Sequence, residues 1–204
     1  MAYRPHVLKL GGSLLELPDL HERLTRFVAG VAGAPTVIVV GGGAVADWVR
    51  AYDRRFHLNK VQSHWCAVHA MQLNARMLAQ SWPQAKTIDG PERARDDVGE
   101  VFIVDPLRWL EVDEGQGHGI PHRWSFTSDS IAAHVALRLE SRHLTLLKST
   151  LPDPDETLAD AARRGVVDAD FPQAARSIPC VRLVNLRSPA VIPPMWSPRQ
   201  PTLA

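Results

Sequence analysis

The sequence predicts an α/β protein with a mostly parallel central sheet, because short apolar segments alternate with segments of helical periodicity along most of the chain. The segments HVLKL (6–10) and PTVIVV (35–40) are apolar almost throughout, which is typical of parallel strands buried on both faces. The sequence has no repeat of fixed period and no domain linker. We therefore expect one domain over residues 1–187 and a proline-rich tail over residues 188–204.

The elements of the first half follow from the spacing of apolar residues. A helix is expected within residues 18–33, where apolar side chains recur every three or four positions before a glycine. A second helix starts after the glycine run 41–43, and a longer third helix covers roughly residues 62–81. KTID (86–89) and VFIVD (101–105) are expected to be strands on either side of a charged connection.

In the second half, residues 114–124 are rich in glycine and histidine and are expected to form a loop. The segment TSDSIAAHVALRLE (127–140) opens with capping residues and continues at helical spacing. HLTLLKS (143–149) and VRLVNL (181–186) are expected to be strands, separated by a proline-rich turn and two short helices within residues 151–177. The tail is expected to be loose or to lie across the surface.

The overall composition excludes several classes of protein. The 204 residues carry a net charge of +1, which gives no electrostatic footprint for DNA or RNA. No segment approaches the roughly 18 apolar residues needed to cross a bilayer, and the N-terminus has no signal-peptide pattern. Cys66 and Cys180 are far apart and have no metal-binding spacing. We expect a cytoplasmic protein that binds neither nucleic acid nor membrane.

A glycine-rich turn follows the first strand, in the sequence KLGGS. Main-chain N–H groups at Gly11 and Gly12 can form an anion-binding concavity, and Ser13 adds a hydroxyl. A helix follows, whose N-terminus favours a phosphate, and Lys9 supplies a full positive charge at the same edge. A tight turn with an exposed Lys9 is the alternative, since a glycine-rich turn alone is a weak signal.

A second glycine turn, VIVVGGG, lies between a buried strand and a helix. Gly41, Gly42 and Gly43 give it a surface free of side chains. Residues 41–46 also match the dinucleotide pattern G-x-G-x-x-A. That pattern requires an acidic residue about 20 positions later, and residues 56–64 contain none. A dinucleotide-dependent oxidoreductase is therefore disfavoured.

A third cluster of polar residues, Thr127, Ser128, Asp129 and Ser130, stands at a helix start. Helix capping explains one or two of these residues, but not three hydroxyls and a carboxylate in four positions. A carboxylate here could orient lysines, and the hydroxyls could hold a nucleotide. Capping remains the alternative.

A second lysine, Lys148, ends a strand just as Lys9 does. Strand-end lysines, glycine turns and an acid at a helix start meet at one edge of a parallel sheet. Phosphoryl transfer requires positive charge on both sides of the moving group and main-chain donors around it. The Walker A pattern is absent from the sequence, so this would not be a P-loop enzyme.

These motifs resemble the amino acid kinase superfamily, which includes acetylglutamate, aspartate and uridylate kinases. The resemblance rests on K-x-G-G-S from Lys9, V-G-G-G from Val40 and T-S-D-S-I-A from Thr127, and it extends over about residues 6–186. It implies a three-layer α/β/α sandwich, ATP with Mg²⁺ as the phosphoryl donor, and a homo-oligomer.

The resemblance also implies a role for each motif residue. Lys9 and Lys148 would flank the transferred phosphoryl group, and Asp129 would hold both lysines in place. Gly11 and Gly12 would donate hydrogen bonds to phosphate oxygens. From the residues themselves, Ser13, Thr127, Ser128 and Ser149 are also expected to bind ATP or phosphate. Gly42 and Gly43 would line the acceptor's pocket. From the residues themselves, Gly41, Asp47, His64 and Trp65 are also expected to bind the acceptor substrate, and a solvated helix residue is the alternative for Asp47.

Within the superfamily, the chain is most similar to small kinases of methanofuran biosynthesis that act on an aminomethylfuran-methyl phosphate. The segments 63–71, 121–136, 146–149 and 166–172 carry this similarity. It implies a phosphorylated small acceptor that receives a second phosphate. The later G-G-M-x-x-K turn of many relatives is missing, and STLPDPDETL stands in its place. Lys148 would then supply the second lysine, as a strand-end lysine does in uridylate kinases.

The nine histidines do not form a metal-binding motif. His64 and His69 are five residues apart, so a helix directs them differently, and His118 and His122 lie in the expected loop without a nearby carboxylate motif. No metal site of the protein's own is predicted. His64 and Trp65 are expected to grip a small ring substrate; a core Trp65 and a surface-capping His64 are the alternative.

Three function classes remain open. A small-molecule kinase fits all the motifs, with uridylate and carboxylate acceptors as alternatives to the furan. A non-catalytic nucleotide or metabolite sensor on the same fold would keep the glycine turns but lose a lysine or the acid. The presence of Lys9, Asp129 and Lys148 favours catalysis over a sensor and over the oxidoreductase.

Overall fold

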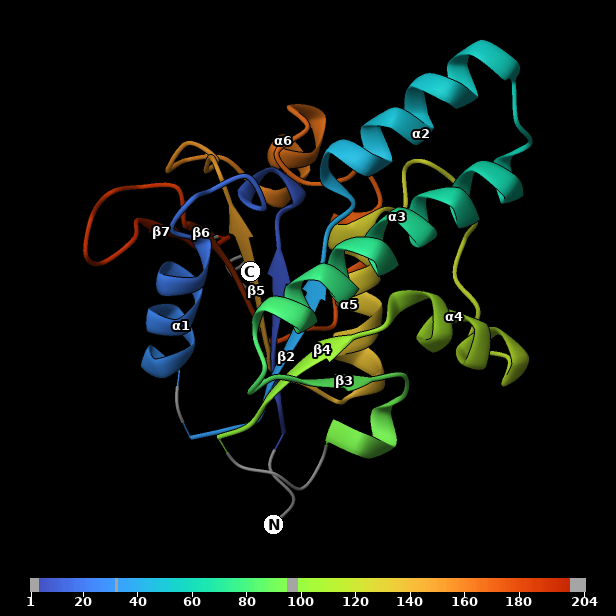
Figure 1. The fold of residues 1–204 in the computed structure, drawn as a ribbon. Coiled ribbons are helices and arrows are strands. Elements are labelled where there is room, and N and C mark those ends of the chain that lie inside the picture. The colour runs from blue at the N-terminus through green and yellow to red at the C-terminus, as the bar shows by residue number, and fades with distance from the viewer. Residues whose placement is uncertain (1–3, 32, 95–98, 199–204) are drawn as a thin grey trace.

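The computed structural model describes residues 4–31, 33–94 and 99–198. Residues 95–98 of the expected charged connection and the last six residues of the tail therefore lie outside the described residues. Figure 1 shows one central sheet with helices on both sides. Its seven strands have the order β3-β4-β2-β1-β5-β6-β7, and all neighbours are parallel except β6 and β7.

The strands are β1 (His6–Leu10), β2 (Thr36–Val40), β3 (Lys86–Ile88), β4 (Val101–Val104), β5 (His143–Lys148), β6 (Cys180–Asn185) and β7 (Met195–Trp196). The α-helices are α1 (Leu20–Gly30), α2 (Gly43–Phe56), α3 (Lys60–Ser81), α4 (Pro106–Gly115), α5 (Ser128–Arg138), α6 (Leu158–Arg163) and α7 (Phe171–Ala174). Two 3₁₀ helices complete the set, η1 (Gly12–Leu14) and η2 (Pro91–Ala94).

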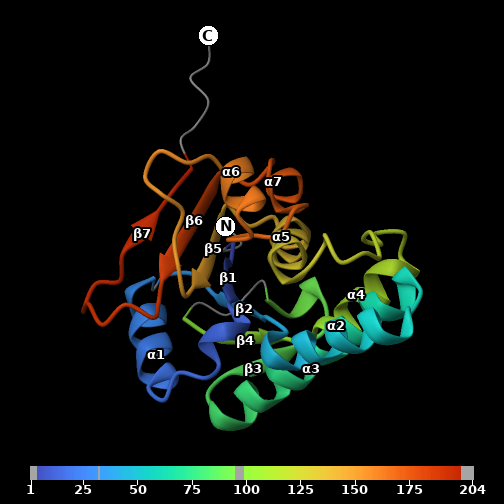
Figure 2. The same ribbon diagram turned by 90° about the horizontal axis from the view of Figure 1, so that it is seen from above.

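The strands bury both faces, so alternate residues enter two separate cores. Val7 of β1 joins a core that includes side chains of α5, α7 and the first half of α3. Leu8 and Leu10 join a second core that includes α1 and the last part of α3. Figure 2 shows α1 and α5 on opposite sides of the sheet. The predicted three-layer α/β/α architecture is confirmed.

The strand order places β1 at a topological switch point. From β1 the chain proceeds to β2, then to the edge strand β3 and back to β4 between β3 and β2, and it then adds β5 and β6 on the other side of β1. In open parallel sheets, ligands bind outside the carboxyl ends of the strands at such a point. The carboxyl ends of β1 and β5 carry Lys9 and Lys148.

Helix α4 was not predicted from the sequence. Helix α4 has signals that were overlooked: Asp105 caps it by accepting a hydrogen bond from the Arg108 N–H, Pro106 is its first residue, and Trp109 is fully buried. The loop expected from residue 114 therefore begins after Gly115.

Strand β7 lies in the proline-rich tail and pairs antiparallel with β6. Trp196 is buried and its Nε1 donates to the main-chain oxygen of Asp153 at 3.1 Å. This part of the tail is fixed to the sheet edge. No helix in the described residues combines the length and apolar character needed to span a bilayer.

Candidate functional site

Lys9, Asp129 and Lys148 form a compact group, here called the ion cluster. Lys9 Nζ lies 2.9 Å from Asp129 Oδ1, and Lys148 Nζ donates to Asp129 Oδ2 at 2.7 Å. Lys9 is 5% exposed and Asp129 is 4% exposed. The alternative in which Lys9 is an exposed residue of a tight turn is therefore wrong.

Sheet geometry explains why two lysines 139 positions apart in sequence meet. Lys9 is paired with Leu146 of the adjacent strand, and Lys148 is two residues beyond Leu146. Side chains two residues apart point to the same face of a strand. That face is covered by α5, whose first turn carries Asp129 between the two ammonium groups.

The cluster combines burial with opposite charges. Burial would raise the pKa of Asp129, but the charges of Lys148 and Lys9 and their hydrogen bonds outweigh it, so its pKa is held well below the ordinary value. Burial, together with the nearby Lys9 charge, lowers the pKa of Lys148 to about 8, although Asp129 opposes this change. Two cations and one anion leave a positive charge available for a phosphate.

Asp168 supports the ion cluster and was not among the site residues predicted from the sequence. Its Oδ2 accepts hydrogen bonds from Thr127 N–H, Thr127 Oγ1 and Ser130 N–H at 2.9–3.0 Å, and its Oδ1 accepts one from Ser130 Oγ. Its own N–H donates to Asp129 Oδ2 at 3.1 Å. Burial and the Asp129 charge raise the pKa of Asp168, against the effect of the Ser130 and Thr127 hydrogen bonds.

Asp168 changes the interpretation of the α5 N-terminus. Thr127 occupies the N-cap position, but its side chain makes no capping hydrogen bond within α5. The Asp168 carboxylate caps the helix from a distant loop, so the capping alternative does not account for Asp129. Asp168 belongs to a segment used for the family resemblance, but its contact with α5 depends on tertiary structure.

The glycine turns after β1 and β2 touch each other. A Cβ on Gly12 would lie 2.2 Å from the Gly43 main-chain nitrogen, so this approach requires glycine. Gly43 has a φ of 50°, in the left-handed region that glycine favours. A Cβ on Gly41 would lie 2.8 Å from the Gly12 nitrogen and 3.3 Å from Ser128 Oγ. The three turns expected to meet are therefore brought together.

Gly11, Ser13 and Ser149 lie at the same edge. The Gly11 N–H donates to the Leu147 carbonyl at 2.8 Å, which ties the first glycine turn to the residue before Lys148. Ser13 Oγ donates to Ser149 Oγ at 3.2 Å. Their roles in binding phosphate stay predictions.

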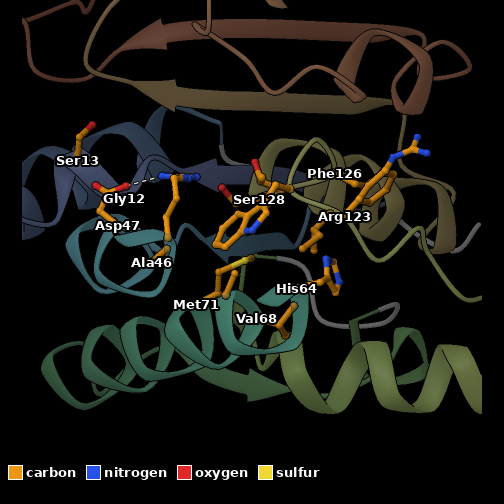
Figure 3. Close-up of a pocket in the computed structure, with 17 residues that line it drawn as sticks. Gly12, Ser13, Ala46, Asp47, His64, Val68, Met71, Arg123, Phe126 and Ser128 are labelled. Atoms are coloured by element: carbon orange, nitrogen blue, oxygen red, sulfur yellow. Dashed lines mark hydrogen bonds and ion pairs between the residues drawn. The ribbon is translucent and has the colours of Figure 1, made fainter. Parts of the chain in front are cut away.

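A cavity of about 160 Å³, here called the central cavity, opens between the glycine turns and α3 (Figure 3). The N-termini of α2 and α5 reach it, since Gly43 and Ser128 are lining residues. Helix N-termini present free N–H groups and favour anions. The lining residues are Gly12, Ser13, Gly42, Gly43, Ala46, Asp47, Arg50, His64, Ala67, Val68, Met71, Arg123, Trp124, Phe126, Thr127, Ser128 and Ile131.

The residues expected to bind the acceptor have different positions. Asp47 and His64 line the central cavity together with Gly42 and Gly43. His64 is 3% exposed and Asn59 caps α3, so a surface-capping His64 is wrong. Trp65 and Gly41 are not lining residues, and the half-buried Trp65 packs against the core and the His122 ring. The core alternative describes Trp65 better.

Further polar residues fix the cavity wall. Asn74 Nδ2 donates to the carbonyl oxygens of Gly41 and Gly42 at 2.8 and 2.9 Å, which holds the second glycine turn. Trp124 Nε1 donates to Asp53 at 2.6 Å, so the loop before α5 is attached to α2. Apart from the asparagine itself, nothing in the sequence indicated that Asn74 would hold the second glycine turn.

A larger cavity of about 430 Å³ lies between α1, β6 and the tail, and none of the predicted site residues lines it. None of the ion-cluster residues lines the larger cavity, whereas the central cavity is lined by both glycine turns and the start of α5, so we place the functional site at the central cavity. No group of three or more His, Cys, Asp or Glu side chains in the described residues could hold a metal ion.

The site can now be compared with known proteins. The sequence model described as "Amino acid kinase family" matches residues 5–150, which is more than half of the chain. The chain belongs to the amino acid kinase family. The resemblance stated from its sequence motifs is thus confirmed.

A curated relative narrows the comparison within the family. The [5-(aminomethyl)furan-3-yl]methyl phosphate kinase of Methanocaldococcus jannaschii is 26% identical over 144 residues. The match covers 69% of this chain and 64% of the relative, so it spans less than two thirds of the relative's length.

Solved structures support the family fold. The UMP kinase from Bacillus anthracis matches with a TM-score of 0.59 and 15% identity, over 94% of this chain and 91% of that one. The uridylate kinase from Archaeoglobus fulgidus matches with a TM-score of 0.60 and 18% identity, over 87% and 88% of the two chains. The aspartate kinase from Synechocystis has a TM-score of 0.57 and 16% identity, over 95% and 40%. These identities relate the folds alone.

Proposed function

We propose that this protein is an ATP-dependent kinase that transfers the γ-phosphoryl group of Mg-ATP to a small phosphorylated acceptor. The observation that carries the proposal is the ion cluster, in which Lys9 and Lys148 reach one carboxylate from adjacent strands. A phosphoryl group in transfer carries its negative charge on peripheral oxygens, so cations held on two sides stabilise it. Membership of the amino acid kinase family supports the same reaction.

The reaction breaks the bond between the γ-phosphorus and the β,γ-bridging oxygen of ATP. An oxygen of the acceptor's phosphate forms the new bond to phosphorus, and the products are ADP and a diphosphate. Lys9 and Lys148 would neutralise the oxygens of the moving group and of the leaving ADP. Asp129 holds both ammonium groups in place, so they need not reorganise during transfer.

Main-chain donors suit the phosphates of ATP. Gly12 and the N-terminus of α5 would supply N–H groups, and Ser13, Ser128 and Ser149 would supply hydroxyls. The Gly11 N–H already donates to the Leu147 carbonyl, so Gly11 would contribute only by shaping the turn. Thr127 would act indirectly, because its hydroxyl already donates to Asp168. Mg²⁺ would enter on the nucleotide, since this ion is commonly bound through substrate phosphates and retains several waters.

The acceptor would occupy the central cavity. A volume of about 160 Å³ suits a small ring better than a nucleoside, because pockets for larger ligands span roughly 300–1,000 Å³. The name of the curated relative points to an aminomethylfuran-methyl phosphate. The product would be its diphosphate, a good leaving group for a later step in one-carbon carrier biosynthesis.

Two alternatives are kept as outcomes of the test. Uridylate or carboxylate kinase activity is supported by the folds of UMP and aspartate kinases. A non-catalytic sensor on the same fold would show binding without turnover. A homo-oligomer and a cytoplasmic location stay predictions.

The test is formation of ADP from Mg-ATP with a panel of acceptors, with the product identified by mass spectrometry. The panel contains the aminomethylfuran-methyl phosphate, UMP, aspartate and N-acetylglutamate. Lys9→Ala should lower turnover by about a hundredfold or more, as loss of a preorganised charge contact does. Lys60→Ala, at an exposed position on α3, is the matched control and should leave the rate unchanged. No ADP formation with any acceptor would refute the kinase proposal.

A further inference from the structure

His64 is a polar residue of the central cavity that lacks a partner. It lies near the start of α3, is 3% exposed, and its Nε2 is buried with no hydrogen-bond partner in the described residues. Figure 3 shows His64 on the opposite side of the cavity from Gly12 and Ser13. Buried polar atoms are rarely left unpaired, because each costs free energy. A buried, unpaired nitrogen in a residue that lines a cavity points to a ligand.

The environment keeps the His64 ring uncharged. Burial and the neighbouring His122 lower the pKa of His64 to about 4. The two rings are stacked with centroids 5.0 Å apart. A hydrogen bond with the main chain of Arg123 acts in the opposite direction, as a ring N–H donating to a carbonyl does. An uncharged imidazole has one donor and one acceptor nitrogen, so Nε2 is an acceptor in the tautomer that carries its proton on Nδ1.

The charged side chains that line the cavity already have partners. Asp47 accepts a hydrogen bond from Arg50 at 2.6 Å, and the Arg50 guanidinium lies 4.8 Å from the centroid of the Trp124 ring. Arg123 makes two hydrogen bonds of 2.8 Å to Asp170.

The rest of the wall beside His64 is apolar and buried. Val68 and Met71 come from α3, Ile131 comes from α5, and Phe126 precedes α5. The cavity thus has one end that suits a phosphate, at the glycine turns, and an opposite end with a single acceptor atom. Asp47 does not belong to that opposite end, since Figure 3 places it beside Gly12 and Ala46.

We propose that His64 selects acceptors that carry a primary amine at the end distant from their phosphate, by accepting a hydrogen bond from that amine at Nε2. An uncharged imidazole nitrogen pairs well with an ammonium donor, whereas a methyl group in the same place leaves Nε2 unpaired. Sites built for a hydrogen bond discriminate strongly against analogues that lack the donor. This proposal rests on the proposed function, in which the acceptor carries an aminomethyl group.

The experiment compares two acceptors, [5-(aminomethyl)furan-3-yl]methyl phosphate and its 5-methyl analogue. Binding without ATP is measured by calorimetry, and kcat/KM is measured with Mg-ATP. The parent should prefer the amine by about a hundredfold or more. His64→Phe should remove most of this preference by weakening the amine compound alone, and His64→Gln, which keeps an acceptor atom, should restore part of it. His69→Phe, exposed on the same helix, should change neither compound.

The two readouts separate this proposal from the proposed function. Amine-selective binding without ADP formation would support the role of His64 and refute the kinase. Turnover of both furans at equal efficiency would support the kinase and overturn the role of His64. Equal losses for both compounds in His64→Phe would indicate a structural role and also overturn it. If neither compound binds the parent protein, the role of His64 is also overturned. This last measurement needs no variant, so it remains possible even if His64→Phe does not fold.

Discussion

The ion cluster and the wall of the central cavity around His64 differ in whether their buried polar groups have partners within the protein. In the ion cluster, Asp129 contacts both lysines, and Asp168 attaches the same helix turn to a distant loop. At His64, a buried nitrogen has no partner in the part of the chain that the structure describes. Charged side chains that act in the same way on every substrate can have their ion-pair and hydrogen-bond partners within the protein. A group that recognises one substrate must be left for that substrate.

The largest effect is expected from breaking the ion cluster. Asp129→Asn removes the anion between two buried lysines, so kcat/KM should fall by about a thousandfold or more. The free energy of unfolding should fall by about 3 kcal/mol, because two buried cations lose their counter-ion. Kinetics and chemical denaturation measure the two effects. Glu111→Gln, on the surface of α4, is the control, and a near-parental rate for Asp129→Asn would contradict the role of the cluster.

A smaller effect is expected from separating the glycine turns, which join the cluster to the cavity. Gly12→Ala would place a Cβ 2.2 Å from the Gly43 nitrogen, so one turn must move. We expect kcat/KM to fall by about a hundredfold, the usual result of misplacing reacting groups. Gly30→Ala is the matched control, since a Cβ there meets no atom within 4 Å. Equal activity in both variants would show that the contact between the turns is unimportant.

Asp168→Asn tests the hydrogen bonds by which Asp168 holds the start of α5 next to the ion cluster. Asparagine keeps one acceptor oxygen but replaces the other with an amide that cannot accept from Ser130 or Thr127. We expect a loss of about 1–2 kcal/mol in the free energy of unfolding and a fall of about tenfold in kcat/KM. Stability that drops without any change in rate would restrict Asp168 to a structural role.

The smallest effects concern pH and distinguish the two regions directly. The pKa of Lys148 is lowered to about 8, so the lysine is charged below this pH and loses its proton above it. The kcat/KM for ATP should therefore decrease above about pH 8, by up to about tenfold per pH unit. Lys148→Arg should remove this decrease, because a guanidinium remains charged.

His64 should give no such response near neutral pH. Its pKa is lowered to about 4, so the ring stays uncharged from pH 5 to 8. The ratio of kcat/KM for the amine and methyl acceptors should stay constant across this range, since the titration of the shared phosphate cancels. A ratio that changes with a pKa near 6.5 would show that His64 titrates as an ordinary histidine.

The sequence was most informative where local pattern and sheet geometry agree. Lys9 and Lys148 end apolar strands, and parallel strands bring such ends to one edge, so their meeting could be predicted. Asp168 and Asn74 could not be found in this way. Each acts through a contact more than 30 positions away, and although Asp168 lies in a segment used for the family resemblance, no local pattern predicts either contact.

At other positions the structure differs from the prediction because a sequence signal was overlooked or was misleading. Asp105 and Pro106 mark the start of α4 clearly, but the glycines and histidines that follow directed attention to a loop. The prolines of the tail suggested irregular structure and hid the short strand β7. Trp65 stands next to His64 in sequence, yet a helix turns adjacent side chains by about 100°. Of these two residues, His64 lines the central cavity and Trp65 does not.

The position of His64 on α3, apart from the strands that carry the lysines, has a consequence for how such proteins diversify. A substitution in this helix can alter which compound is accepted while the electrostatic machinery stays intact. Selection for a new metabolite could act on one wall of the cavity without rebuilding the chemistry. The same property makes α3 the natural place to begin redesign toward other phosphomonoesters.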